Sequence, residues 1–257
     1  MLTRHRTGDL SVLRGGAADA PLVVLLHGLA GSGQELAPLA EALMADGHRV
    51  VAPDQRGHGH SIRRPADLSR AAYVDDVLSL VDGPASLVGQ SMGAHTAMLA
   101  ASARPDLIHR LVMIEGGVGG STDDYPTRLQ EWFAGWPAPF ADEAAARMFL
   151  GDESITEAWV ADLEPVDGGL RPRFDADVMG AAIRPVAATA RWAEWERLTT
   201  PTLLIQGENG KNDPAEVRRM LTRPGVRDVV VAGAGHDVHL DRPAETAQLV
   251  AAFLSAG

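Results

Sequence analysis

The chain has 257 residues, of which 46% are hydrophobic, so it holds enough apolar material for one large domain or for a domain with an insertion. Its 34 acidic and 23 basic side chains give a formal net charge of −11, and an acidic surface of this kind repels nucleic-acid phosphates and anionic lipids. The absence of cysteine excludes disulfides, cysteine nucleophiles, thiolate zinc sites and iron–sulfur clusters.

The N-terminal residues carry no apolar core of the kind found in a signal peptide. Apolar runs elsewhere fall short of the roughly 20 residues that a membrane-spanning helix needs. We therefore expect a cytoplasmic protein that acts on a small molecule and binds neither nucleic acid nor a membrane. The sequence leaves its oligomeric state open.

Strand patterns and helix patterns alternate through the first 115 residues. Continuous apolar and β-branched runs predict buried strands at residues 22–26, 48–52, 85–89 and 110–115. Helical periodicity predicts helices at about 34–45, 70–81 and 92–103. The alternation returns near the end, with predicted strands at 202–206 and 228–231 and a closing helix at about 244–254. This order indicates an α/β fold with a mostly parallel, doubly wound sheet.

Residues 116–198 interrupt the alternation. All five tryptophans and four of the five phenylalanines lie in this segment. We expect it to form a mainly helical cap inserted into an α/β core made of residues 1–115 and 199–257. The aromatic side chains are expected either to line a substrate pocket or to form the core of the cap itself, and the sequence does not separate these two interpretations.

The strongest chemical signal is the pentapeptide GQSMG at residues 89–93. It joins a predicted strand to a predicted helix, and a serine at such a turn projects its hydroxyl out of the sheet. Side chains at Gly89 and Gly93 would collide with the neighbouring strand and helix. The helix that follows also favours negative charge beside Ser91. Ser91 is therefore the candidate nucleophile.

Two further elements would complete the chemistry of acyl transfer. The developing oxyanion needs hydrogen-bond donors, and the backbone N–H groups of Met92 and Leu29 are the candidates. The general base should follow the last strand, where His236 comes after small residues in a loop. His239 is a weaker candidate because it lies at the start of the closing helix. We expect His27, before the Leu29 loop, to be a structural hydrogen-bonding residue.

These features resemble the α/β-hydrolase superfamily, in its small capped branch of esterase-like and lactonase-like proteins. The landmarks that carry the resemblance are His27-Gly28, DQRGHG at residues 54–59, GQSMG at residues 89–93, and Gly235-His236. They cover residues 20–115 and 200–257, whereas the cap matches only in position. The resemblance implies a Ser–acid–His triad in that chain order, and no cofactor. We also expect no metal, because the histidines include no His-Glu-x-x-His motif.

The acid of the triad is where the sequence departs from the family. The family's usual aspartate follows the strand at residues 202–206, and the corresponding position here is Gly210. Asp213 and Glu208 lie in the same loop but out of register. A second location known in the superfamily is the end of the strand after the nucleophile helix, where Glu115 stands. Glu115 is the favoured prediction, and Asp213 and Glu208 remain the alternatives.

The sequence thus predicts a cofactor-independent serine hydrolase of the carboxylesterase and lactonase kind. Its substrate would be a small, fairly apolar carboxylic ester, thioester or lactone, cleaved through an acyl-enzyme on Ser91. Two alternatives stay open. One is carbon–carbon bond hydrolysis on the same triad, and the other is a non-catalytic homologue that keeps the fold as a ligand-binding pocket.

Overall fold

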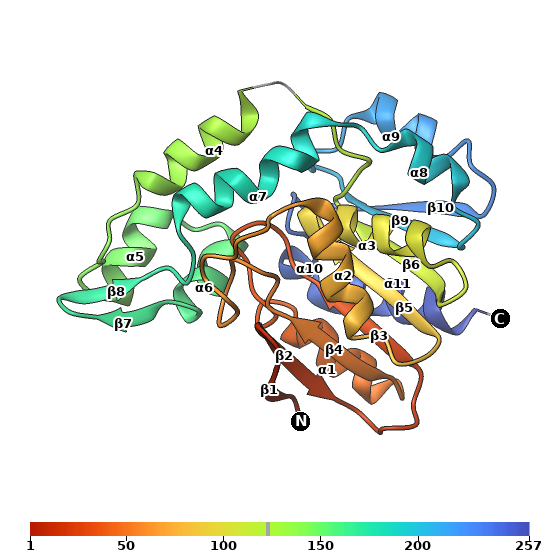
Figure 1. Ribbon diagram of the computed structural model, residues 1–257, viewed down its shortest axis with the longest axis horizontal. Coiled ribbons are helices and arrows are strands. Elements are labelled where there is room, and N and C mark those ends of the chain that lie inside the picture. The colour runs from red at the N-terminus through yellow and green to blue at the C-terminus, as the bar shows by residue number, and fades with distance from the viewer. Residues whose placement is uncertain (122–123, 257) are drawn as a thin grey trace.

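A single eight-stranded sheet forms the centre of the computed structural model, which describes residues 1–121 and 124–256 (Figure 1). In spatial order its strands are β1 (Thr3–Thr7), β2 (Leu10–Gly15), β4 (Arg49–Pro53), β3 (Leu22–Leu26), β5 (Ala85–Gln90), β6 (Ile108–Ile114), β9 (Thr202–Gly207) and β10 (Val226–Val231). The six strands from β4 to β10 run parallel, and β2 is antiparallel to both of its neighbours. The prediction of a mostly parallel sheet is confirmed.

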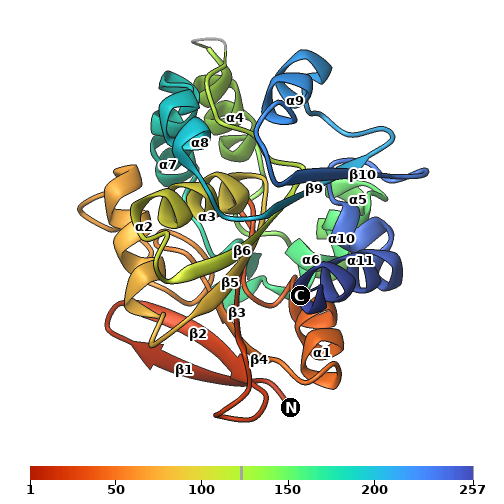
Figure 2. The ribbon, with the colours of Figure 1, turned by 90° about the vertical axis from the view of Figure 1, so that its right-hand side faces the viewer.

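Helices cover both faces of the sheet (Figure 2). One face carries α1 (Ala37–Ala45), α10 (Val238–Asp241) and α11 (Pro243–Ser255), and the other carries α2 (Arg70–Ser79), α3 (Met92–Ala103), α8 (Trp192–Arg197) and α9 (Pro214–Met220). Strand β3 shows the reason, because Leu22 and Val24 belong to one core cluster and Val23 and Leu25 to the other. A strand that is apolar on both faces needs two helical layers.

Most of the predicted elements are present, with small shifts at their ends. Helix α3 has the bounds predicted for it, whereas α1 begins only at Ala37, because residues 33–36 form turns. The β1–β2 hairpin was not predicted. Strand β1 is a largely exposed edge strand of polar residues, so it lacks the apolar pattern on which strand prediction depends.

The described residues of the segment at 116–198, apart from α8, lie over one edge of the sheet (Figure 1). The segment contains α4 (Tyr125–Ala134), α5 (Glu143–Leu150), α6 (Ser154–Ala161), a hairpin of β7 (Glu164–Val166) and β8 (Gly169–Arg171), and α7 (Ala176–Ala188). Four of its buried aromatic residues gather in one cluster: Phe133, Trp136, Phe140 and Phe174. Helix α8 packs instead on the main core through Trp195. We propose that this segment acts as a cap that α8 anchors to the core.

Within the part of the chain that the structure describes, no helix combines the length and the apolar character needed to cross a membrane.

Candidate active site

Ser91 occupies a strained turn between β5 and α3. Its backbone has φ 50° and ψ −116°, a conformation that residues with side chains rarely adopt. The flanking glycines permit the turn, because a Cβ atom on Gly93 would lie 2.5 Å from the carbonyl oxygen of His27, and one on Gly89 would lie 2.5 Å from the backbone nitrogen of Ala94. The predicted strand-to-helix turn is present, and its packing leaves no room for a side chain at either glycine.

Replacing Gly93 with alanine should destabilise the fold by about 1–3 kcal/mol, because the added methyl group would overlap the carbonyl groups that end β3. The matched control is Gly83→Ala, since a Cβ atom on Gly83 would meet nothing within 4 Å. Urea denaturation of the two variants measures the difference in the free energy of unfolding. Equal stabilities would contradict this account of the turn.

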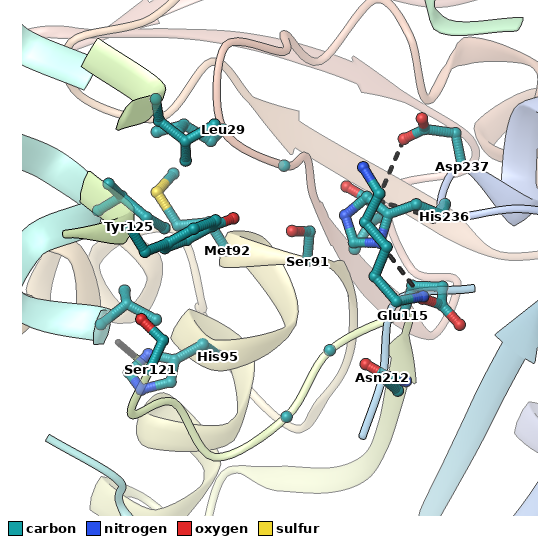
Figure 3. Close-up of a pocket in the computed structure, with 18 of the residues that line it drawn as sticks. Leu29, Ser91, Met92, His95, Glu115, Ser121, Tyr125, Asn212, His236 and Asp237 are labelled. Atoms are coloured by element: carbon teal, nitrogen blue, oxygen red, sulfur yellow. Dashed lines mark hydrogen bonds and ion pairs between the residues drawn. The ribbon is translucent and has the colours of Figure 1, made fainter. Parts of the chain in front are cut away.

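All five residues predicted for the site line one cavity of about 640 Å³. They are Ser91, His236, Glu115, Leu29 and Met92 (Figure 3). Loops after β3, β5, β6 and β9 contribute to the wall, together with the loop before α10 and residues of the cap. The carboxyl ends of parallel strands meet at one edge of a sheet, which is why residues so distant in sequence converge there. The aromatic cap residues Trp132, Phe133 and Trp159 also line the cavity.

His236 is hydrogen-bonded to Glu115 inside this cavity. The imidazole Nδ1 lies 3.3 Å from Oε2 of Glu115, and the carboxylate is buried. Glu115 also accepts backbone N–H bonds from Gly207 at 2.9 Å and from Lys211 at 2.8 Å. These bonds fix the carboxylate, which in turn fixes the ring. With its proton on Nδ1, a neutral imidazole presents Nε2 as a proton acceptor.

The two alternative acids are engaged elsewhere. Asp213 caps α9 by accepting the N–H of Ala215 at 2.8 Å, and Glu208 accepts the N–H of Gly233 at 2.8 Å. Within the described residues, neither carboxylate is hydrogen-bonded to His236.

Residue 210, the usual position of the acid, has no room for a side chain because the Glu115 carboxylate lies against it. A Cβ atom there would lie 2.5 Å from Cδ of Glu115 and 2.6 Å from its Oε2. The Glu115 carboxylate therefore fills the space that a side chain on residue 210 would enter. An aspartate at residue 210 and a glutamate at residue 115 would compete for the same space, so this chain has Glu115 and a glycine at residue 210.

The residues that carry the candidate oxyanion donors line the same cavity as Ser91. Met92 is the first residue of α3, and the first amides of a helix have no partner inside it. Leu29 follows Gly28 in the loop after β3, and both residues line the cavity. His27 holds this loop, because its Nε2 accepts the backbone N–H of Gln55 at 2.8 Å and its Nδ1 lies 2.7 Å from the carbonyl oxygen of Gly28.

Comparison with known proteins agrees with the α/β-hydrolase fold. A model of the alpha/beta hydrolase family matches residues 23–249. The chain belongs to this family. It is 30% identical to 2-(acetamidomethylene)succinate hydrolase of Mesorhizobium japonicum, over 93% of this chain and 89% of that protein. It is 28% identical to esterase YbfF of Escherichia coli, over 91% of this chain and 92% of that protein.

A solved structure of E-2-(acetamidomethylene)succinate hydrolase superposes with a TM-score of 0.89 at 28% identity, over 100% of both chains. The protein is thus a hydrolase of the α/β fold. Among the residues that the structure describes, no three or more histidine or carboxylate side chains gather as metal ligands would.

One positioning residue of this hydrolase was missed from the sequence. Gln90, next to the nucleophile, donates from Nε2 to the carbonyl oxygen of His236 at 3.1 Å and to Oδ1 of Asp237 at 3.3 Å. Burial raises the pKa of Asp237, so this hydrogen bond also satisfies a carboxyl group that water reaches poorly. Gln90 therefore ties the His236 loop to the Ser91 turn. The middle position of a Gly-x-Ser motif carries no signal for such a role.

Replacing Gln90 with leucine should lower kcat about ten- to a hundredfold, because a loosened His236 loop misplaces the imidazole. The KM should change little and the melting temperature should fall by only about 2–4 °C, the cost of one lost hydrogen bond, so a tenfold or larger loss of kcat separates positioning from a general loss of structure. Gln248→Leu, on the exposed side of α11, is the matched control. An unchanged kcat in the Gln90 variant would contradict the role.

Proposed function

We propose that this hydrolase cleaves a carboxylic ester, thioester or lactone of a small, fairly apolar substrate through an acyl-enzyme on Ser91. The observation that carries the proposal is the His236–Glu115 hydrogen bond in the same cavity as the strained Ser91 turn. A serine in a glycine-flanked turn, a histidine with its ring fixed and backbone donors nearby are the parts that acyl transfer requires.

In the proposed reaction, Nε2 of His236 takes the proton of the Ser91 hydroxyl as its oxygen attacks the substrate carbonyl. The tetrahedral oxyanion accepts hydrogen bonds from the N–H groups of Leu29 and Met92. The imidazolium then protonates the leaving group, and Glu115 stabilises its positive charge. Water, deprotonated by His236, attacks the acyl-enzyme, releases the carboxylic acid and regenerates Ser91.

The cavity and the relatives support the substrate class. Aromatic and aliphatic residues of the cap line part of the cavity wall, which suits an apolar portion of a small molecule. Esterase YbfF is named for ester hydrolysis, and 2-(acetamidomethylene)succinate hydrolase for hydrolysis of a small organic acid. The catalytic assignment for this chain rests on its own geometry.

The test combines a burst assay with covalent labelling. Short-chain p-nitrophenyl esters should give a rapid release of p-nitrophenolate followed by slower turnover, and a fluorophosphonate should label one site. Mass spectrometry of the labelled peptide should place the adduct on Ser91. An enzyme that shows neither burst nor label would contradict the proposal and favour a non-catalytic binding protein.

A further inference from the structure

A buried acidic residue, Glu35, forms part of the cavity wall on the side of His236. Glu35 lies in the loop between β3 and α1 and is 7% exposed. Its carboxylate lies against the Leu29 loop, because a Cβ atom on Gly31 would lie 2.7 Å from Cδ of Glu35. One of its oxygens lies 3.7 Å from Nε2 of His239 in α10. Glu35 is therefore enclosed between the loop that carries a candidate oxyanion donor and the segment that carries the candidate base.

The Glu35 carboxylate accepts no hydrogen bond within the part of the chain that the structure describes. Its one potential ion-pair partner there is His239, and 3.7 Å is too long for a hydrogen bond. Both carboxylate oxygens keep accessible surface, whereas the ring nitrogens of His239 have almost none. A buried anion without a donor costs stability. The carboxylate is therefore open to a positively charged donor that enters the cavity.

A second carboxyl group, that of Asp237, lies near Glu35 in the same wall. Burial raises the pKa of Asp237, and the charge of Glu35 raises it further, so the nearby cationic groups offset these two causes only in part. Oδ1 of Asp237 accepts the bond from Gln90, and Oδ2 accepts none within the described residues. Lys211, which is exposed, is the one lysine or arginine among the described residues of the wall, whereas six acidic residues line it. The wall therefore favours a cation.

The two carboxyl groups lie on the side of the cavity that receives the leaving group. Figure 3 shows Asp237 beside His236 on one side of Ser91. Met92 and Tyr125 lie on the other side. Because His236 protonates the leaving group in the proposed reaction, that group must lie next to its ring. Selection by charge therefore acts on the alcohol half of an ester, and the acyl chain extends toward the other side.

We propose that Glu35, with Asp237 beside it, binds an ammonium group on the leaving alcohol, which makes the preferred substrate an ester of an amino alcohol. The inference rests on the proposed acyl transfer at Ser91 and specifies its substrate class. The protonated amine donates to a carboxylate oxygen, and charge-assisted hydrogen bonds of this kind are stronger than neutral ones. When the ester C–O bond breaks, the alcohol oxygen takes the imidazolium proton of His236, and the ammonium group leaves unchanged.

The test compares the 2-(dimethylamino)ethyl and 3-methylbutyl esters of butyric acid, whose alcohols have the same shape and differ in charge at pH 7. A tertiary amine cannot accept the acyl group, and chromatography of the released butyrate measures both rates. The wild-type enzyme should favour the charged ester in kcat/KM by at least about tenfold beyond the ratio of the uncatalysed hydrolysis rates. In Glu35→Gln, which keeps the size of the side chain, this preference should fall by at least about tenfold. Asp237→Asn should also lower it, so the test survives a Glu35 variant that fails to fold.

The matched control is Glu41→Gln, since Glu41 is exposed on α1 and does not line the cavity. Its preference for the charged ester should equal that of the wild type. A wild-type preference that survives Glu35→Gln overturns the proposal. A preference that disappears in Glu153→Gln overturns it as well, because the ammonium group would then bind an exposed acid that lines the cavity from the cap.

Failure of the two proposals can be told apart. If the wild-type enzyme cleaves the 3-methylbutyl ester without favouring the charged one, acyl transfer stands and the ammonium site is wrong. If it cleaves neither ester and takes no fluorophosphonate label, acyl transfer is wrong. Calorimetry with 2-(dimethylamino)ethanol then decides the ammonium site, since binding that is at least about tenfold weaker in Glu35→Gln supports it and equal binding overturns it.

Discussion

Ser91→Ala should lower kcat/KM at least about 10⁴-fold on any ester that the wild-type enzyme cleaves, because no other group can form the acyl-enzyme. The oxyanion donors and the cavity remain in this variant, so KM should change far less than kcat. Steady-state kinetics with a p-nitrophenyl ester, together with fluorophosphonate labelling, measures both effects. Retention of more than a few per cent of the wild-type kcat would rule out Ser91 as the nucleophile.

The control for Ser91→Ala is Ser86→Ala, which removes a hydroxyl from β5, the strand that leads to Ser91, away from the cavity. It should leave kinetics unchanged. Alanine and serine both carry a Cβ atom, so the strain at φ 50° is the same in both, and the stability of Ser91→Ala should stay close to that of the wild type. A large loss of stability would mean that the hydroxyl serves the fold, and the kinetic result would then say little about catalysis.

The sequence predicts those features of this hydrolase that a few neighbouring residues define. The Ser91 turn is local, because one strand, one helix and two glycines within a short window define it. The bounds of α3 were predicted correctly for the same reason. The apolar runs also indicate the two-layered burial of the parallel strands, whereas the polar edge strand β1 has no such pattern and was missed.

Contacts between distant segments were harder to predict. Glu115, Asp213 and Glu208 differ in whether the fold brings their carboxylates to His236. The residues next to each of them in the sequence give no sign of this. Gln90 was missed because it is a single polar residue in an otherwise ordinary stretch. Only the packing shows that its side chain ties the His236 loop to the Ser91 turn.

The placement of Glu115 follows from the topology of the sheet. Strands β6 and β9 are adjacent and parallel, with Ile114 paired to Ile205. A carboxylate at the end of β6 and one in the loop after β9 can therefore reach the same point in space. Glu115 has φ 45°, and its backbone N–H donates to the carbonyl oxygen of Ile205 at 2.9 Å. The positive φ redirects the chain as it leaves β6.

Glu115→Gln should lower kcat about 10³- to 10⁴-fold, because an amide cannot stabilise the imidazolium and can favour the wrong tautomer of His236. Asp213→Asn and Glu208→Gln should each change kcat less than about threefold, since their hydrogen bonds serve the backbone and not the ring. Kinetics of the three variants on one ester separates the candidates. Equal and mild losses in all three would remove Glu115 from the triad.

A substitution at Gly210 tests the assignment of Glu115 as the triad acid more directly. In the wild-type protein, Gly210→Asp should be strongly damaging, because its Cβ atom would displace the Glu115 carboxylate. In a Glu115→Ala background that space is vacant, and an aspartate at residue 210 would point its carboxylate toward the position that Glu115 held beside His236. The double variant should therefore recover at least about tenfold in kcat over Glu115→Ala alone.

The same substitution, Gly210→Asp, would be harmful in the wild-type background and beneficial in the Glu115→Ala background. If Gly210→Asp is harmful in both, the two positions do not share one role, and the argument that Glu115 has taken over the family's usual acid site fails.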